Sequence, residues 1–435
     1  MIQNCHNKAL QDAFQYYQNF EQKLMDDLRS QGVKFAERNS HCHEVKTLLS
    51  QLKAKGAKAY LSNASVKYGW VSQACFECSS IRTSTSTYTA TLQCHRDCFY
   101  CIDYTRWQPK AGATHGIEYL TDKDALASKR KLKCAAITGG EPLLDLDTTY
   151  AMLSKLKELF PNVHTRLYTS GDLATVDVLK KLQKLGLQEI RFSIKYYDDP
   201  ATLEKVFDNM KIATAYIPDV VVEMPIIPGE KQKLQRYMQR FDDIGIKGMN
   251  LLEMVFNIVN WSNFEQRGLL AKNPISPIPA YYGYCHGGIK SGPVAGSEQL
   301  ALELMAWAID QKFSFGMHYC SVENKFRGDV LSYNKDFINC QSAYDFDRED
   351  YFIKTAKVFG PDCEIAKPML EQAGCKHFIY NNNQHSMAFE RRYIPKLLKS
   401  SVTPLISYNI GVEDNGRRFL SEIALKEINL ATNGQ

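Results

Sequence analysis

Residues 91–104 read TLQCHRDCFYCIDY and place Cys94, Cys98 and Cys101 in a C-x3-C-x2-C pattern. Three thiolates in one loop suit zinc poorly, because a structural zinc site normally takes four ligands from paired C-x2-C units. A cubane iron–sulfur cluster fits the loop better, since each thiolate binds one iron. Three cysteines then leave one iron free to bind a small molecule. The spacing therefore predicts a [4Fe–4S] cluster with one open iron, held by these three residues.

Strand-like and helix-like stretches alternate from about residue 87 onward. The expected strands are TYTATLQ (87–93), CAAIT (134–138), HTRLYT (164–169), EIRFSIK (189–195), VVVEMPII (220–227), GMNLLEM (248–254) and FGMHYC (315–320). Between several of them lie amphipathic stretches, at 173–186, 200–216, 231–245 and 297–311. Such alternation predicts parallel strands joined by right-handed helical crossovers. Six or seven units of this kind would form a partial or full β/α barrel.

Two further features lie beside predicted strand ends, where β/α folds place their chemistry. The sequence ITGGEP (137–142) overlaps the end of the second predicted strand, and an aromatic residue, Tyr100, precedes the last cysteine of the loop. A C-x3-C-x2-C loop of this form, together with GGEP, resembles the signature of radical S-adenosylmethionine (radical SAM) enzymes. The resemblance covers about residues 87–325 and leaves both ends of the chain outside it.

The resemblance implies a cofactor and a reaction. The amino and carboxylate groups of S-adenosylmethionine (SAM) would chelate the open iron. An electron from the cluster would then cleave the sulfonium and give a 5′-deoxyadenosyl radical that abstracts hydrogen from a substrate. In such a protein the cofactor carries the hard chemistry, while the barrel orients the reactants and excludes water.

Several residues match positions that bind SAM in this family. The backbone of the GGEP motif and Glu141 would meet the methionine ammonium, and its glycines allow close backbone approach. Ser193 and Lys195 resemble positions that reach the ribose and the carboxylate, and Lys195 is also a catalytic candidate. The cofactor-binding residues implied by the resemblance are Tyr100, Gly139, Gly140, Glu141, Pro142, Thr169, Ser193, Lys195 and Asn250.

The expected fold class is α/β, a partial (β/α)6 radical SAM barrel with a helical N-terminal region and a small mixed C-terminal domain. The N-terminal region would span 1–85 and carry a C-x2-C pair, and the barrel would span 86–345. Within the barrel, the Pro- and Gly-rich stretch 262–296 predicts a long loop or lid. The C-terminal domain would span 346–435, where the sequence DNG predicts a hairpin turn.

The remaining cysteines raise the question of a second metal centre. CFEC (75–78) could be half of a zinc site, half of an auxiliary cluster, or an incidental pair. Cys320, in HYCS at a late strand end, is the further ligand we favour and a catalytic candidate, with His318 as a partner or as an ordinary strand histidine. The HYCS stretch, Lys325 and the upstream C-x2-C resemble a subgroup of radical SAM proteins related to pyruvate formate-lyase activating enzyme. Other candidate ligands are Cys285, Cys340, Cys363 and Cys375.

Composition is that of an ordinary globular protein. The chain has 435 residues, 44% of them hydrophobic, thirteen cysteines and a net charge of +5. This small charge does not indicate a nucleic-acid partner. No apolar run is long enough for a membrane span, and the N-terminus lacks a signal-peptide pattern, so we expect a cytoplasmic protein. In a reducing compartment, clustered thiols indicate metal or redox chemistry.

Three functions are consistent with these features. The first is a radical SAM enzyme that uses a low-potential electron donor, such as flavodoxin or ferredoxin, and acts on a peptide, a protein or a small molecule. The second is a glycyl-radical enzyme activase, disfavoured because no ferredoxin-like cysteine run follows Cys101. The third is a non-enzymatic zinc- or redox-binding module, which leaves GGEP and the strand–helix alternation unexplained.

Overall fold

A computed structural model describes residues 7–78, 85–101, 120, 132–282, 288–338 and 343–428. The contacts divide the chain into two compact units. One comprises residues 33–275 and 291–325, and the other comprises 1–32, 276–290 and 326–435. The units are not continuous in sequence, because the first helix and part of the expected lid group with the C-terminal residues. The division into three consecutive domains stays a prediction.

The first unit is built on a nine-stranded sheet in the order β1-β2-β11-β8-β7-β6-β5-β4-β3. The pairs from β3 to β8, and the pair of β8 with β11, are parallel. All seven strands expected from the sequence are therefore present, in sequential order. Their bounds are β3 (Thr85–Thr91), β4 (Cys134–Gly139), β5 (His164–Thr169), β6 (Glu189–Phe192), β7 (Asp219–Ile226), β8 (Gly248–Glu253) and β11 (Gly316–Cys320).

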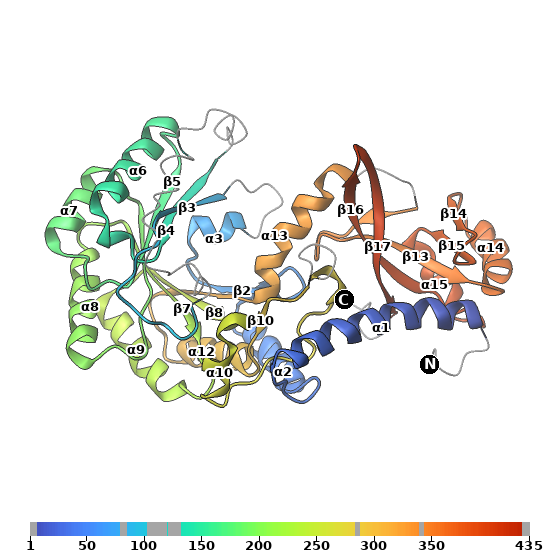
Figure 1. The fold of residues 1–435 in the computed structure, drawn as a ribbon, viewed down its shortest axis with the longest axis horizontal. Helices are drawn as coiled ribbons and strands as arrows, with labels where there is room; N and C mark the ends of the chain where they lie inside the picture. Colours follow the sequence, from blue (N-terminus) through green and yellow to red (C-terminus); the bar gives the residue numbers. More distant parts are fainter. Residues whose placement is uncertain are drawn as a thin grey trace. The chain divides into compact units, whose positions relative to one another are not determined.

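Helices follow the strands and cover one face of this sheet, as Figure 1 shows for α6 to α9. Each crossover helix buries an apolar stripe, as with Leu234, Met238 and Phe241 on α9. The arrangement is an open α/β barrel, whose sheet ends at β1 and β3. The helices are α2 (Cys42–Ala54), α6 (Leu146–Leu159), α7 (Val176–Lys184), α8 (Pro200–Ala213), α9 (Lys231–Ile244), α10 (Trp261–Glu265) and α12 (Ser297–Asp310), with single turns at η3 (Pro142–Leu144) and η4 (Ile258–Asn260).

An antiparallel hairpin extends the sheet beyond its last parallel strand. Strand β2 (Ser65–Tyr68) pairs with β11, and β1 (Lys58–Tyr60) pairs with β2. The short helix α3 (Gln73–Cys78) follows the hairpin and lies on the side of the sheet away from α6 to α9 (Figure 1). These two strands lie in the region expected to be helical. Strands of three and four residues are too short to show a period in the sequence.

Part of the expected lid is ordered structure. Strand β10 (Ser291–Pro293) pairs antiparallel with β9 (Val255–Asn257), and Ala271 bridges to Phe35 and Val294. The stretch is thus fastened to the barrel at these points. Residues 283–287, including the candidate ligand Cys285, lie outside the described residues.

The second unit contains an antiparallel sheet in the order β14-β15-β13-β16-β17, with β12 also paired to β13. The predicted DNG turn joins its two longest strands, since Asp414 pairs with Arg417. Helix α1 (Lys8–Ser30) packs on this sheet through Leu10 and Tyr17, which contact Phe359, Leu405 and Leu425. The other elements are β12 (Asp345–Phe346), β13 (Ile353–Phe359), α14 (Asp362–Gln372), β14 (Phe378–Asn381), β15 (Ser386–Phe389), η6 (Arg391–Tyr393), α15 (Ile394–Leu397), β16 (Leu405–Asp414) and β17 (Arg417–Glu427), with α13 (Val322–Asn334) and η5 (Lys335–Phe337) before them.

Gly316 allows the hairpin connection to lie against β11. A Cβ at this position would lie 1.8 Å from the carbonyl oxygen of Trp70. Gly316→Ala should lower the free energy of unfolding by about 3 kcal/mol, because neither backbone can yield easily. Gly328→Ala is the control, since its Cβ meets nothing within 4 Å in α13. Denaturant unfolding measures both variants, and equal stability of the two would contradict this account of Gly316.

A second prediction concerns His318, which is buried on β11 and lies 2.9 Å from the hydroxyl of Ser65. Burial, with the positive charges of Lys67 and Arg191, lowers the pKa of His318 to about 3. Between pH 6.5 and 3 the unfolded state binds a proton that the folded state does not, so stability falls as pH falls. Relative to pH 7.5, the wild type should lose about 1.4 kcal/mol more than His318→Gln at pH 5.5. An equal response of both proteins in unfolding experiments would contradict a neutral His318.

Candidate active site

The carboxyl ends of the parallel strands surround one pocket of about 470 Å³. The cysteine loop follows β3, the GGEP turn follows β4, and further polar residues follow β5 and β6. The predicted site residues on its wall are Cys94, Cys98, Tyr100, Cys101, Gly139, Gly140, Glu141, Thr169, Ser193 and Lys195. Lys325 also lies on the wall, and wall residues that the sequence analysis did not single out include Arg96, Tyr168, Ser170, Glu223 and Glu253.

The cysteine loop is tied to the next strand ends by charged side chains. His95 Nε2 lies 2.8 Å from a carboxylate oxygen of Asp172, and Arg96 pairs with Asp172 at 3.2 Å and with Asp198 at 3.3 Å. Burial opposes the charge of Asp172, but hydrogen bonds from His95 and Ser170 and the charge of Arg96 hold its pKa below the usual value. The sequence has basic residues in the cysteine loop and acidic residues after β5 and β6. This pairing of opposite charges could have predicted the ion pairs that anchor the loop.

Asn260 holds the same loop from the other side. Its Nδ2 donates to the carbonyl oxygens of Phe99 at 2.9 Å and of Cys101 at 3.2 Å. The ring of Phe99 packs edge-on against Phe264, and the guanidinium of Arg267 lies 4.2 Å from its centroid. The loop backbone between the second and third cysteines is therefore fixed by both polar and aromatic contacts.

The GGEP turn is hydrogen-bonded to the beginning of the cysteine loop. The N–H of Gly140 donates to the carbonyl of Thr91, and that of Glu141 to the carbonyl of Gln93, both at 2.8 Å. Gly139 has φ +141°, and a Cβ there would lie 2.1 Å from the Thr91 carbonyl oxygen. Only glycine permits this close approach of β3 and β4.

The carboxylate of Glu141 joins the ends of β4 and β5. Oε1 accepts from the Leu143 N–H at 3.1 Å and from the Thr169 hydroxyl at 2.8 Å. Oε2 accepts from the N–H of Ser170 at 2.6 Å and from its hydroxyl at 2.7 Å. A carboxylate offers about four acceptor positions, and these donors reach all of them, with the one hydroxyl proton of Ser170 shared between Glu141 and Asp172. Glu141 thus positions the turn and also lies on the pocket wall, and its contact with the methionine ammonium stays a prediction.

Two polar side chains project from the end of β6 into the pocket. Lys195 Nζ donates to the hydroxyl of Ser193 at 2.9 Å, and both residues are partly exposed on the pocket wall. Pro142 begins η3 and is buried away from that wall. An ammonium and a hydroxyl together suit the carboxylate or ribose of a ligand.

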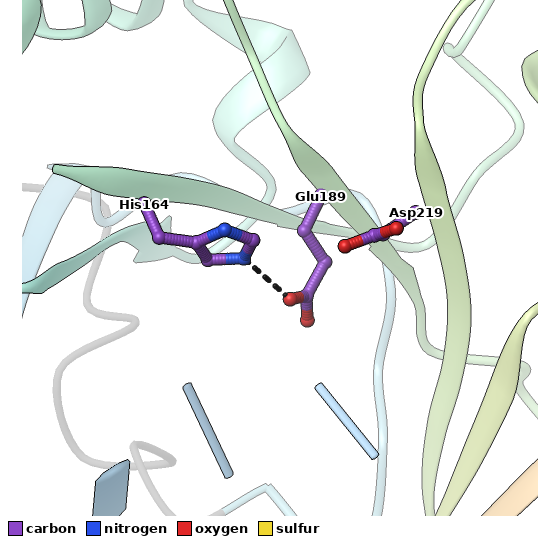
Figure 2. Close-up of side chains that lie close together, drawn as sticks. All are labelled: His164, Glu189 and Asp219. Atoms are coloured by element: carbon purple, nitrogen blue, oxygen red, sulfur yellow. Dashed lines mark hydrogen bonds and ion pairs between the residues drawn. The ribbon is translucent and has the colours of Figure 1, made fainter. Parts of the chain in front are cut away.

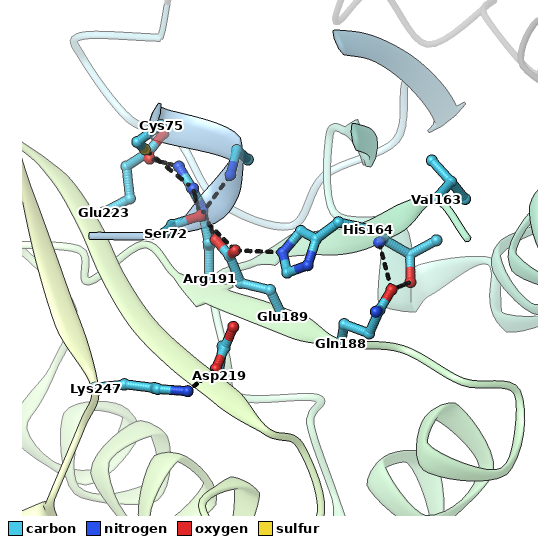
Figure 3. Close-up of polar contacts among 12 residues, drawn as sticks. Ser72, Cys75, Val163, His164, Gln188, Glu189, Arg191, Asp219, Glu223 and Lys247 are labelled. Carbon is cyan, nitrogen blue, oxygen red and sulfur yellow. Dashed lines mark hydrogen bonds and ion pairs between the residues drawn. The ribbon is translucent and has the colours of Figure 1, made fainter. Parts of the chain in front are cut away.

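Asn250 does not lie on the pocket wall, where its expected cofactor-binding role would place it. It is buried on β8, where its Nδ2 donates to Cys75 Sγ at 3.2 Å and to Glu223 at 2.6 Å, and it is absent from the pocket wall. Arg191 contacts the same two residues, as Figure 3 shows. Asn250 therefore belongs with the C-x2-C cysteines in the barrel interior.

Cys320 ends β11 and is likewise set among polar groups. Its Sγ accepts from Asn324 Nδ2 at 3.2 Å. Burial raises the pKa of its thiol to about 12, against the positive charge of Lys325. His318 bonds Ser65 and is held neutral, which favours an ordinary strand histidine over a partner of this thiol.

One cluster of potential metal ligands lies at the opposite ends of the strands. His164, Glu189 and Asp219 bring ligand atoms within 4.8 Å of one another at the first residues of β5, β6 and β7 (Figure 2). Each group already has a protein partner, because His164 bonds Glu189 at 2.8 Å and Asp219 pairs with Lys247 (Figure 3). We interpret this cluster as an ion-paired structural network.

None of the helices in the described part of the chain combines the length and apolar character that crossing a membrane requires.

Known proteins resemble parts of this chain. It is 28% identical over 234 residues to a protein of Methanocaldococcus jannaschii that carries the provisional name glycyl-radical enzyme activating enzyme, a match covering 52% of this chain and 57% of that protein. An uncharacterised protein of the same organism is 27% identical over 147 residues, which is 32% of this chain and 46% of that protein. The chain thus spans little more than half the length of the first relative.

Solved structures with a similar arrangement include Streptococcus suis SuiB bound to SAM. That similarity has a TM-score of 0.39 at 10% identity, over 55% of this chain and 50% of SuiB. Another is anSMEcpe with bound SAM and a peptide, with a TM-score of 0.32 at 17% identity, over 40% of this chain and 51% of that one.

A family model gives the assignment. Residues 88–240 match the model of the Radical SAM superfamily. The matched span runs from β3 to α9 and contains both the cysteine loop and the GGEP turn. This part of the chain is therefore similar to the radical SAM superfamily.

Proposed function

We propose that this chain is a radical SAM enzyme that uses a [4Fe–4S] cluster on Cys94, Cys98 and Cys101. When bound, the cluster supplies the electron that cleaves SAM to a 5′-deoxyadenosyl radical, which abstracts hydrogen from a substrate. The observation that supports this function best is the pocket of about 470 Å³, because the three cysteines and the GGEP turn share its wall. The proposal covers peptide, protein and small-molecule substrates, with a low-potential donor such as flavodoxin or ferredoxin.

The residues present fit such a cluster. Cys94, Cys98 and Cys101 are half-buried thiols on one loop that is anchored at both sides. The backbone N–H of Arg96 already donates to Cys94 Sγ at 3.4 Å, which is a contact that stabilises a thiolate. A buried, hydrogen-bonded loop of this kind presents its sulfurs without a large rearrangement.

The rest of the pocket wall suits SAM. In the proposal, the backbone beside Gly139 and Gly140 faces the methionine ammonium, while Lys195 and Ser193 hold the carboxylate or ribose. Tyr100 and apolar residues from β7 to β9 exclude water, which strengthens the electrostatic contacts inside. The apolar wall residues on these strands are Pro225, Leu252 and Val255.

A glycyl-radical activase is a second candidate. The observation in its favour is the name of the Methanocaldococcus jannaschii relative, which matches 57% of its own length to this chain. Such an activity would place a radical on a glycine of a partner enzyme. It predicts a protein-based EPR signal in the partner after incubation with this chain and SAM.

Removal of the three thiols tests the proposed site. The Cys94→Ala/Cys98→Ala/Cys101→Ala variant should release no 5′-deoxyadenosine above background, because no ligand for the cluster remains. The measurement is chromatography of anaerobic reactions that contain SAM and a low-potential reductant. A Cys42→Ala/Cys134→Ala/Cys375→Ala variant, which loses as many thiols elsewhere, should keep the activity. Continued release by the first variant would show that the site is wrong.

Glu141→Gln tests the junction between β4 and β5. Each carboxylate oxygen accepts one backbone N–H, so either orientation of an amide would set its NH2 against a backbone donor. The lost bond costs about 1–3 kcal/mol, and about tenfold weaker SAM binding should follow as the turn shifts. Calorimetric titration of SAM measures the affinity.

Glu303→Gln is the matched control, because Glu303 accepts only from the movable side chains of Lys231 and Gln299. Its SAM affinity should equal that of the wild type. If Glu141→Gln also bound SAM with wild-type affinity, the junction would not control the shape of the pocket.

A further inference from the structure

Three cysteines outside the proposed SAM site lie on two segments that both contact β2. Strand β11, which Cys320 ends, pairs with β2, and Lys67 on β2 donates to the carbonyl of Cys75 at 3.5 Å. Cys75 and Cys78 lie on α3, and Cys320 ends β11. Burial raises the pKa of Cys320, and the charges of Cys78 and Cys75 raise it further. The same three thiols act on the ammonium of Lys67 on β2, whose pKa burial lowers. Segments far apart in sequence therefore deliver three thiols to one region.

Nitrogen donors point at these sulfurs. Arg191 Nη2 and Asn250 Nδ2 each lie 3.2 Å from Cys75 Sγ, and Asn324 Nδ2 lies 3.2 Å from Cys320 Sγ. Figure 3 shows Cys75 on its helix beside Arg191 and Glu223. A neutral thiol is only a weak acceptor, so donors of this strength suit sulfur that is a thiolate or a metal ligand.

The surrounding charge has the sign that such a site requires. Lys67, Arg166, Arg191 and Lys325 all act electrostatically on these thiols or on the Glu223 carboxylate beside them. Lys67 and Arg191 are buried and Arg166 is partly buried, so their charges require anions nearby. Glu189 and Glu223 already pair with Arg191. Metal-bound thiolates would add negative charge beside Lys67 and Arg166.

Buried cysteines in this chain can also be simple packing residues. Cys375 is 3% exposed and lies in a cluster with Ala366, Leu370 and Phe389, and its Sγ donates only to a backbone carbonyl. The side chains packed on Cys375 are apolar, as expected for a cysteine that acts as a small hydrophobe. Cys75 and Cys320 differ from it in having side-chain donors on their sulfurs.

We propose that Cys75, Cys78 and Cys320 bind a second iron–sulfur cluster. Tetrahedral zinc, with Zn–S bonds of about 2.3 Å, would draw the sulfurs to about 3.8 Å from one another. Among the described residues these three sulfurs do not form a group within 4.8 Å, so they are not gathered as a tetrahedral zinc site would require. The inference does not depend on the proposed SAM cleavage.

The proposed second cluster lies beside the pocket that contains the proposed SAM site. Glu223 and Lys325 line that pocket. Glu223 shares Arg191 and Asn250 with Cys75, and the charge of Lys325 acts on Cys320. A substrate in the pocket would therefore lie between two clusters. Three protein ligands also leave one iron of a cubane open to a group from the pocket.

Metal analysis of a variant without the first site tests this inference. The Cys94→Ala/Cys98→Ala/Cys101→Ala protein, reconstituted anaerobically with iron and sulfide, should retain about four irons and about four sulfides per chain. Adding Cys75→Ala, Cys78→Ala and Cys320→Ala should remove them all. The control adds Cys42→Ala, Cys134→Ala and Cys375→Ala to the first variant instead and should keep the iron.

The outcomes are distinct. Absence of iron from the first variant, one zinc in its place, or iron that persists after all six substitutions would each overturn the second cluster. The first measurement needs no substitution in the barrel interior, so iron and sulfide retained by the first variant do not depend on the folding of the six-cysteine variant. A wild type that holds both clusters but never cleaves SAM would defeat the proposed function and leave this inference standing.

A redox titration measures the midpoint potential of the second cluster, which a loss of protein stability alone would not change. Asn324→Ala removes the N–H donor on Cys320 Sγ. Hydrogen bonds to cluster sulfurs set the potential, so their loss should shift it to lower values. EPR of the cluster that remains in the first variant follows the shift, and an unchanged midpoint would contradict ligation by Cys320.

Discussion

The buried carboxylate of Glu141 holds the strand ends in the arrangement on which the pocket depends. Its four donors come from the GGEP turn and from the end of β5. The same turn bonds the carbonyls of Thr91 and Gln93, where the cysteine loop begins. Burial of a carboxylate is costly unless it is fully hydrogen-bonded, so the three strand ends are stable only together. The hydrogen-bonded carboxylate of Glu141 thus helps to fix the position at which the cysteine loop begins.

The interior of the barrel is unusually polar. The interiors of β/α barrels are normally filled by bulky branched side chains. Here Arg191, Glu223 and Asn250 face inward from three neighbouring strands and bond to one another or to Cys75. Buried charges of this kind add little to stability, because desolvation offsets their attraction. Their presence next to the thiols of α3 and β11 is explained if they serve a bound group.

The sequence predicted the parallel strands because apolar or β-branched stretches alternate there with amphipathic helical stretches. It did not predict the hairpin of β1 and β2, whose strands have three and four residues. Nor did it place α1 with the C-terminal sheet, because an amphipathic stripe shows that a helix packs but not what it packs on. Asn250 was assigned to the cofactor by motif, whereas its position on β8 directs it to Cys75 and Glu223.

The amino-acid sequence by itself determined the alternation of strands and helices, the three-cysteine loop and the GGEP turn, since these depend on local periodicity and on spacing within a few residues. Only the tertiary structure decided that His95 and Arg96 anchor to Asp172, and that Arg191 and Asn250 contact Cys75. These contacts join residues from separate strands and helices. Which of them meet is fixed by the register and twist of the sheet, and no local pattern records that.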